Sequence, residues 1–152
     1  MQRHISLVSL SRDHHGALIL ARLIQKDAPA YKSLPSTVEG KAAYGVKYYQ
    51  EHLVKHFEQE EKALAFIKGT DKEMDAAIES IFSEHTSLRL LFGSVSGHKD
   101  LQNHLHETGM LLEKHIRTEE RELFPLMQEI CNEEQLTKIK TLLDAGNEQQ
   151  EA

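Results

Sequence analysis

A twelve-residue phrase occurs twice in this chain and constrains its fold more than any other feature. The copies occupy residues 53–64 and 112–123, and both read L-x-K-H-apolar-x-x-E-E-basic-x-L. Residues four apart on a helix lie on one face, about 6 Å apart along the axis. Each copy therefore predicts an imidazole and a carboxylate that point the same way from adjacent turns. These pairs are His56 with Glu60 and His115 with Glu119.

Apolar residues recur at helical spacing along the rest of the chain, and strand signals are nearly absent. This pattern predicts an all-α protein. We expect four long helices at about 5–26, 36–69, 70–95 and 101–124, followed by a short fifth helix at about 133–143. Four long helices with short connections pack most simply as an up-down-up-down four-helix bundle.

Several polar residues have the spacing of helix caps. Ser and Thr residues followed three positions later by Glu predict helix starts, and Asn followed by Gln at the same spacing predicts another. These pairs are Ser36 with Glu39, Thr70 with Glu73, and Asn132 with Gln135. Gly69 is placed to end the second helix, and Pro125 falls at the end of the fourth helix or at a kink in it.

The first and third helices resemble each other more weakly, because His14 and His85 each lie within a stripe of apolar residues. The chain is therefore interpreted as two helical hairpins, each supplying one lone His and one His-x-x-x-Glu pair. Packed with pseudo-twofold symmetry, the hairpins would bring four His and two Glu to the middle of the core. A polar group buried without a partner costs a few kcal/mol, and a pair of metal ions removes that cost.

The donor count of this six-residue site also suits two metal ions. If both Glu bridge, each ion receives two imidazole nitrogens and two carboxylate oxygens, four donors of an octahedral six. The remaining positions would hold a bridging oxo or hydroxo group and an exogenous ligand. Mixed imidazole and carboxylate ligation suits iron, and less exclusively manganese or zinc. The predicted cofactor is thus two iron ions, with manganese or zinc as alternatives.

Neighbouring polar residues leave alternatives open. His15 competes with His14 for the first-helix position, although the apolar stripe favours His14. His52 lies one turn before His56 and fits a channel better than a ligand position. Glu61 and Glu120 are interpreted as surface acids or as acids that orient ligand imidazoles. The adjacent tyrosines at positions 48 and 49 either line a pocket or pack in the core.

Composition limits the class of protein. The 152 residues fit a single domain with its core at about 5–130 and a polar tail from about 146. A net charge of −6 and the lack of basic clusters weigh against nucleic acid or a membrane surface as partner. No apolar stretch approaches the roughly 18 residues of a membrane span. The lone Cys131 suits a reducing cytoplasm, and the oligomeric state stays open.

The histidine and glutamate motifs resemble those of the hemerythrin-like (HHE cation-binding) domain over residues 5–130. The resemblance implies a four-helix bundle that holds a non-haem di-iron centre. It also implies terminal ligands and bridging carboxylates at the matching positions. The implied terminal ligands are His14, His56, His85 and His115, and the implied bridges are Glu60 and Glu119. Oxygen-carrying hemerythrins have a further His four residues after the third-helix His, where this chain has Arg89.

Three classes of function bear on such a centre. We expect a di-iron protein that binds O2, NO or a related small ligand, such as peroxide, as sensor, store or scavenger. The alternative is a di-iron enzyme acting in peroxide reduction or in iron–sulfur or nitrosative damage repair. A phosphotransfer bundle with one exposed His and no metal is a third class, against which the doubled phrase argues.

Overall fold

The computed structural model describes the backbone of residues 2–151 and the side chains of residues 2–146. This part of the chain contains helices and no strands. The α-helices are α1 (Val8–Leu23), α2 (Val38–Tyr48), α3 (Val54–Ile67), α4 (Lys72–Gly93), α5 (Leu101–Thr118), α6 (Phe124–Ile130) and α7 (Glu133–Glu151). A 3-10 turn, η1 (Ile5–Leu7), precedes α1, and two π-helical turns are η2 (Tyr49–Leu53) and η3 (Glu119–Leu123).

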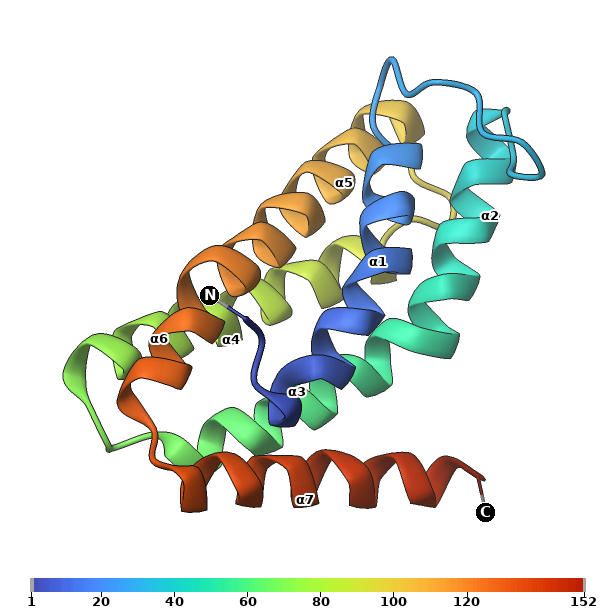
Figure 1. The fold of residues 1–152 in the computed structure, drawn as a ribbon. Helices are drawn as coiled ribbons and strands as arrows, with labels where there is room; N and C mark the ends of the chain where they lie inside the picture. Colours follow the sequence, from blue (N-terminus) through green and yellow to red (C-terminus); the bar gives the residue numbers. More distant parts are fainter. Residues whose placement is uncertain (1, 152) are drawn as a thin grey trace.

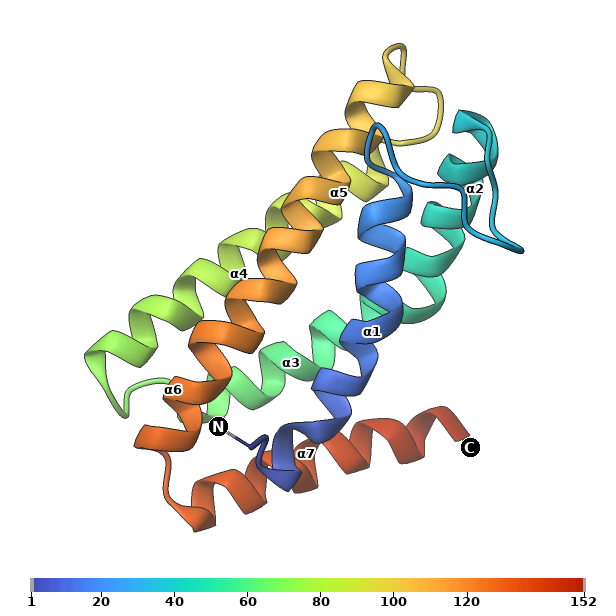
Figure 2. The same ribbon diagram turned by 45° about the horizontal axis from the view of Figure 1, so that its top comes forward.

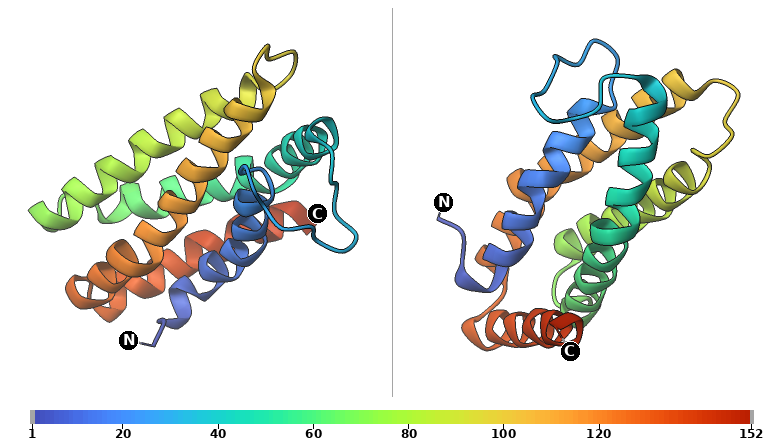
Figure 3. Two further views of the ribbon diagram at one scale, coloured as in Figure 1. Left: turned by 90° about the horizontal axis from the view of Figure 1, so that it is seen from above. Right: turned by 90° about the vertical axis from the view of Figure 1, so that its right-hand side faces the viewer.

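The two π turns join neighbouring α-helices without a break. Thus α2, η2 and α3 form one continuous helix, and α5, η3 and α6 form another. Together with α1 and α4 they give four long helices whose directions alternate up, down, up and down (Figure 1). The predicted all-α bundle is confirmed. The views from above and from the side show α1 beside both α2 and α5 (Figure 3).

The seventh helix is longer than the short fifth helix expected from the sequence. It spans 19 residues and lies across the end of the bundle rather than along it (Figure 2). Its apolar residues Leu136, Ile139 and Leu143 are buried against the base of the other helices. The predicted end near residue 143 was therefore too early for the backbone, whereas the side chains of the tail from 147 onward lie outside the described residues. None of the described helices has both the length and the apolar content of a membrane span.

Two predicted helix starts were wrong by one residue. Thr37, not Ser36, caps α2, because its Oγ1 accepts a hydrogen bond from the Gly40 N–H at 3.0 Å. Asp71, not Thr70, caps α4, where its carboxylate accepts from the Met74 N–H at 3.0 Å. In both cases the residue before the first helical residue has the extended backbone that a cap requires.

Other predicted boundaries were confirmed. Asn132 and Gln135 form reciprocal side chain–backbone hydrogen bonds of 2.8 and 2.9 Å at the start of α7. Gly69 has a φ of +96° just after α3, a conformation that favours glycine.

The predicted end of the fourth helix near Phe124 was wrong, because the long helix continues through Pro125 to Ile130. The Phe124 N–H bonds to the Glu119 carbonyl five residues earlier, and this wider turn relaxes the crowding that proline causes in an α-helix.

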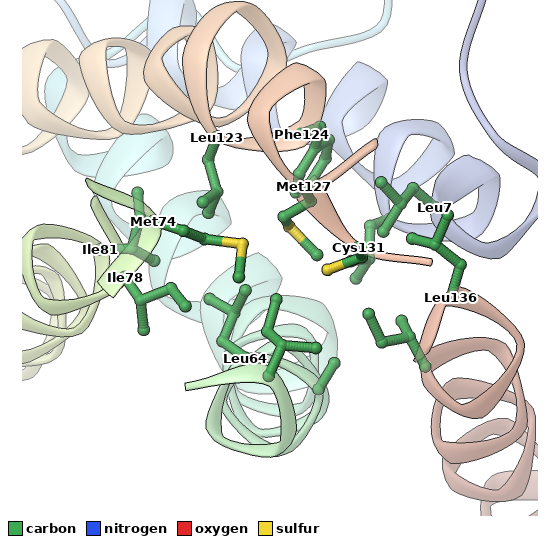
Figure 4. Packing of buried hydrophobic residues seen from close by; sticks show 14 of the residues in the cluster. Leu7, Leu64, Met74, Ile78, Ile81, Leu123, Phe124, Met127, Cys131 and Leu136 are labelled. Atoms are coloured by element: carbon green, nitrogen blue, oxygen red, sulfur yellow. The ribbon is translucent and has the colours of Figure 1, made fainter. Parts of the chain in front are cut away.

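The apolar core consists of two clusters with a polar layer between them. One cluster lies at the end closed by α7 and includes Met74, Leu123 and Met127 (Figure 4). The other lies toward the opposite end and includes Leu20, Leu88 and Phe92 along with Phe57 and Leu112. Six of the buried His and Glu residues lie at the level where these clusters meet. They are His14, His56, Glu60, His85, His115 and Glu119.

Close packing of α1 against α5 depends on a glycine. A Cβ atom at Gly109 would lie 2.4 Å from the backbone carbonyl oxygen of Ala21, so any other residue would push the helices apart. Ala21 lies two turns after His14 and Gly109 lies nearly two turns before His115. The glycine thus sets the separation of the two helices that carry these histidines.

Candidate metal centre

Six buried polar side chains meet in the middle of the bundle, and each long helix supplies at least one. The lone histidines come from α1 and α4, and the paired residues come from α3 and from the junction of α5 with η3. None of the six exposes more than 5% of its surface. The set consists of His14, His56, Glu60, His85, His115 and Glu119, and so contains every residue for which a ligand role was predicted.

Each glutamate of this set lies between two imidazoles. The two oxygens of Glu119 lie 3.3 Å from Nε2 of His14 and 2.5 Å from Nε2 of His115. The two oxygens of Glu60 lie 3.3 Å from Nε2 of His56 and 3.0 Å from Nε2 of His85. Each carboxylate therefore directs one oxygen toward the first half of the site and the other toward the second half, as a bridging carboxylate does.

The donor atoms form two overlapping groups. In the first group His14 and His56 join both glutamates, and in the second His85 and His115 join the same glutamates. Within each group the candidate ligand atoms lie within 4.8 Å of one another. Two His/Glu clusters that share both carboxylates are the arrangement of a binuclear metal site.

The lack of hydrogen bonds to the inner donor atoms also supports a metal site. The four Nε2 atoms and all four oxygens of Glu60 and Glu119 are buried, yet their contacts lack hydrogen-bond geometry. Buried polar atoms are nearly always hydrogen-bonded, and leaving one unsatisfied costs about 1–3 kcal/mol. Eight such atoms gathered in two groups are the donors expected around bound cations, which would accept their lone pairs.

A second layer of four carboxylates orients the four imidazoles. In each case Nδ1–H donates to a carboxylate, which leaves Nε2 as the inward-facing atom. The carboxylate partners lie at distances from 2.7 to 3.1 Å. The pairs are His14 with Glu120, His56 with Asp13, His85 with Glu61, and His115 with Glu84.

The second layer was predicted only in part. Glu61 and Glu120 were expected as surface acids or as acids that orient imidazoles, and they occupy the second of these roles. Asp13 and Glu84 were not assigned any role. A signal for them existed, since each directly precedes a lone His in sequence. Sequence alone did not reveal that each serves a histidine on a different helix.

Basic side chains form ion pairs with three of the four carboxylates of the second layer. Arg3 contacts Glu120 at 2.8 Å, Arg89 binds both oxygens of Glu61, and Lys114 contacts Glu84 at 2.7 Å. Arg89, which stands where oxygen carriers have a fifth His, thus supports the second layer instead of facing the site. Among the described residues Asp13 has no basic partner, and its side chain is 53% exposed.

The centre has unusual protonation equilibria. Burial opposes a charge on His14, but the adjacent carboxylates of Glu119 and Glu120 outweigh burial and raise its pKa to about 9. Burial also opposes a charge on His56 and on His115, but the carboxylates beside them outweigh burial and raise both pKa values to about 10. Burial also opposes ionisation of Glu119, yet the adjacent His115 imidazole holds the pKa of that carboxyl well below its usual range. A metal ion that binds here must therefore displace protons from imidazoles.

A cavity of about 140 Å³ lies mainly against one side of the centre. Its walls include His14 and His56 of the first cluster, but only His115 of the second. His85 is fully buried, and the Phe57 ring stacks on it with ring centroids 4.2 Å apart. The cluster of His14 and His56 is consequently the more accessible one.

The remaining sequence candidates lie outside the inner set. His15 is exposed, while its neighbour His14 lies in the cluster. Tyr48 and His52 line the cavity with ring centroids 4.7 Å apart. Tyr49 stacks on Phe92 in the core with its centroid 4.7 Å away.

Comparison with known families agrees with this geometry. The model of the hemerythrin HHE cation-binding domain matches residues 6–127. The chain belongs to the hemerythrin HHE family. No curated protein and no solved structure matches it significantly. Membership in this HHE cation-binding family and the two overlapping His/Glu clusters agree on a binuclear cation site.

Proposed function

We propose that this HHE protein holds two iron ions and binds O2, NO or a related small ligand as a sensor, store or scavenger. The observation that supports the proposal most is the set of eight buried donor atoms without hydrogen bonds. Two metal ions held between Glu60 and Glu119 would satisfy all eight. The ligand set proposed for them is His14, His56, Glu60, His85, His115 and Glu119.

Iron is favoured by the chemistry of the donors. Each cluster offers two imidazole nitrogens and two carboxylate oxygens, and the described inner set contains no thiolate. Such a mixture suits iron, whereas thiolates would favour zinc or copper(I). Manganese and zinc remain the competing metals. The second layer serves any of them, because it fixes each imidazole with Nε2 facing inward.

The exogenous ligand is proposed to bind at the His14–His56 cluster. Four protein donors leave coordination positions open on each ion, and the cavity gives access to this cluster. Its volume of about 140 Å³ is large enough for a diatomic or triatomic molecule. The closed side, where Phe57 covers His85, would anchor the second ion.

The lone Cys131, buried and free, supports a location in the reducing cytoplasm.

An optical spectrum of the reduced, iron-loaded protein before and after exposure to air and to NO tests this function. Reversible spectral change with each gas is the expected result. No response to either gas would contradict ligand binding. A di-iron enzyme for peroxide reduction or for iron–sulfur or nitrosative damage repair is the second candidate, favoured by the polar side chains of Tyr48 and His52 that line the cavity. Sustained consumption of peroxide would favour the enzyme.

A further inference from the structure

The four carboxylates of the second layer are not equally fixed. Three of them bond to an imidazole and also pair with a basic side chain, namely Glu61, Glu84 and Glu120. Asp13 has no basic partner in the described part of the chain, its side chain is 53% exposed, and its 3.1 Å bond to Nδ1 of His56 is the longest of the four. His56 is therefore the ligand whose supporting acid is held least firmly.

Asp13 and His56 both lie in the wall of the cavity. Glu51, which is exposed, belongs to the same wall, and so does the buried His14. The cavity thus joins exposed carboxylates to the unpaired Nε2 atoms of two ligands. Carboxylates and imidazoles bind divalent cations, and about 140 Å³ holds several water molecules, so a cation can keep part of its hydration shell there. The ammonium nitrogen of Lys55 is buried and does not face this space.

The pseudo-twofold repeat provides an internal comparison for Asp13. Glu84 holds His115 as Asp13 holds His56, but its side chain is only 11% exposed. Lys114, itself 69% exposed, pairs with Glu84 at 2.7 Å. A cation that approaches the second cluster here meets an ammonium group, which repels it, whereas one that approaches the first cluster meets an exposed carboxylate, which attracts it.

The second cluster is also closed at His85. Phe57 lines the cavity and stacks on this fully buried imidazole, so one ring separates the cavity from His85. The guanidinium carbon of Arg89 lies 5.8 Å from the centroid of the same ring, and its nitrogens bind both oxygens of Glu61, the acid that bonds to His85. Release of an ion from this side therefore requires movement of a packed ring or loss of an ion pair.

We infer that divalent metal ions enter and leave the centre through this cavity, past Asp13. The ion at the His14–His56 cluster is then exchangeable, and the ion at the His85–His115 cluster is retained. This inference rests on the proposed function, since it concerns the same two ions. Loss of the first ion leaves the second with two imidazoles and both shared glutamates, a set of four donors. The chain can thus pass one ion to an acceptor, such as a chelator or a metal-free protein, and keep the other.

Uptake of Fe(II) by anaerobic metal-free protein at low ionic strength, followed by stopped flow, tests the route. Asp13→Asn should slow uptake about five- to tenfold, because the entering cation loses a nearby negative charge. Glu84→Gln removes the matching acid of the other cluster and should change the uptake rate less than about twofold. An acid that only orients its imidazole would change the rate of release and not the rate of uptake.

Two exposed acids separate the effect of charge from support of the ligands. Neither Glu51 nor Glu58 bonds to an imidazole in the described part of the chain, and Glu51 lines the cavity whereas Glu58 does not. Glu51→Gln should slow uptake about two- to threefold, and Glu58→Gln, with the same change in net charge, should not. A salt concentration of about 1 M should remove the difference. Wild-type uptake rates in both Asp13→Asn and Glu51→Gln would overturn the route.

Release to a strong Fe(II) chelator shows which ion exchanges. We expect one ion per chain to leave the wild-type protein in a fast phase and the other at least about tenfold more slowly. Phe57→Leu should accelerate the slow phase, because a smaller side chain covers His85 less completely. His14→Ala should lack the fast phase. A single phase for both ions, or a fast phase that persists in His14→Ala, would overturn the ordered exchange.

Failure of this inference is distinguishable from failure of the proposed function. Wild-type protein that holds two iron ions but releases them together contradicts the ordered exchange alone. Wild-type protein that is folded, as shown by circular dichroism, and takes up no Fe(II) contradicts the proposed function as well.

Discussion

The carboxylate of Asp13 lies 3.1 Å from Nδ1 of His56, a residue on another helix, and not against its own neighbour His14. Glu84 repeats this relationship with His115 at 2.9 Å. These two bonds each join the helices of one hairpin. The bonds from Glu61 and Glu120 join one hairpin to the other. Every imidazole of the centre is therefore fixed by an acid from an adjacent long helix. These four bonds also connect the long helices of the bundle to one another.

Removing one acid of this layer should weaken metal binding without abolishing it. We expect Asp13→Asn and Glu84→Gln each to lower metal affinity about 10- to 100-fold, because the imidazole loses the partner that fixes its orientation and tautomer. Competition with a chelator of known affinity measures the change. Glu107→Gln, an exposed acid on α5, is the control and should bind metal like the wild type. An unchanged affinity in both Asp13→Asn and Glu84→Gln would show that the outer acids do not support the ligands.

The inner glutamates should matter more than their sequence neighbours. Glu60→Ala or Glu119→Ala removes a carboxylate shared by both clusters, so most of the metal should be lost from both positions. Glu61→Ala or Glu120→Ala removes only a bond to Nδ1 of one imidazole, and should cost about 10- to 100-fold in affinity. Metal content after dialysis distinguishes the two classes. Equal losses in all four variants would mean that the wrong carboxylates have been assigned as bridges.

Adjacent histidines on α1 offer a matched pair. His14 is 3% exposed and faces Glu119, whereas His15 is exposed. His14→Ala should lower the metal content toward one ion per chain, and His15→Ala should leave it unchanged. Elemental analysis of the purified variants checks this, and a greater loss in His15→Ala would move the ligand by one position.

Metal binding should release protons. At pH 7 the raised pKa values of His14, His56 and His115 keep these imidazoles protonated in the metal-free fold. Binding should therefore release about three protons per chain, and metal affinity should rise with pH up to about 9 or 10. Calorimetry in buffers of different ionisation enthalpy counts the protons. Binding without proton release at pH 7 would contradict this protonation state.

The stability of the metal-free protein should change with pH in the opposite direction. A folded-state pKa raised above the unfolded value of about 6.5 stabilises the fold fully below pH 6.5. That contribution is lost as the pH rises through the folded values of about 9 and 10. Chemical unfolding of metal-free protein should thus show lower stability at pH 10 than at pH 7. Equal stability at both would show that the imidazole–carboxylate pairs do not contribute.

The inner set could be predicted because helical periodicity converts sequence spacing directly into a shared face. His56 with Glu60 and His115 with Glu119 follow from their four-residue separation, and the apolar stripes around His14 and His85 direct these residues inward. The long helices follow from the same periodicity. Conversely, the roles of Asp13 and Glu84 depend on how neighbouring helices are rotated against each other, which no local pattern specifies.

Some local features of the backbone could not be predicted from the sequence either. Asp71 displaced Thr70 as a cap because several polar residues in a row can all accept the hydrogen bond, and tertiary packing selects one of them. The π turn at Glu119–Leu123, which precedes Pro125, has no sequence signature of its own. The length of α7 was underestimated because its last residues are polar and lack an apolar stripe.

The metal content of the wild-type chain tests the central claim most directly. Protein purified from iron-replete cells should contain two metal ions per chain, predominantly iron, because eight inward-facing donor atoms form two clusters that share their carboxylates. A folded protein with close to zero metal per chain would contradict the binuclear centre. A ratio of one would contradict the bridging role of Glu60 and Glu119.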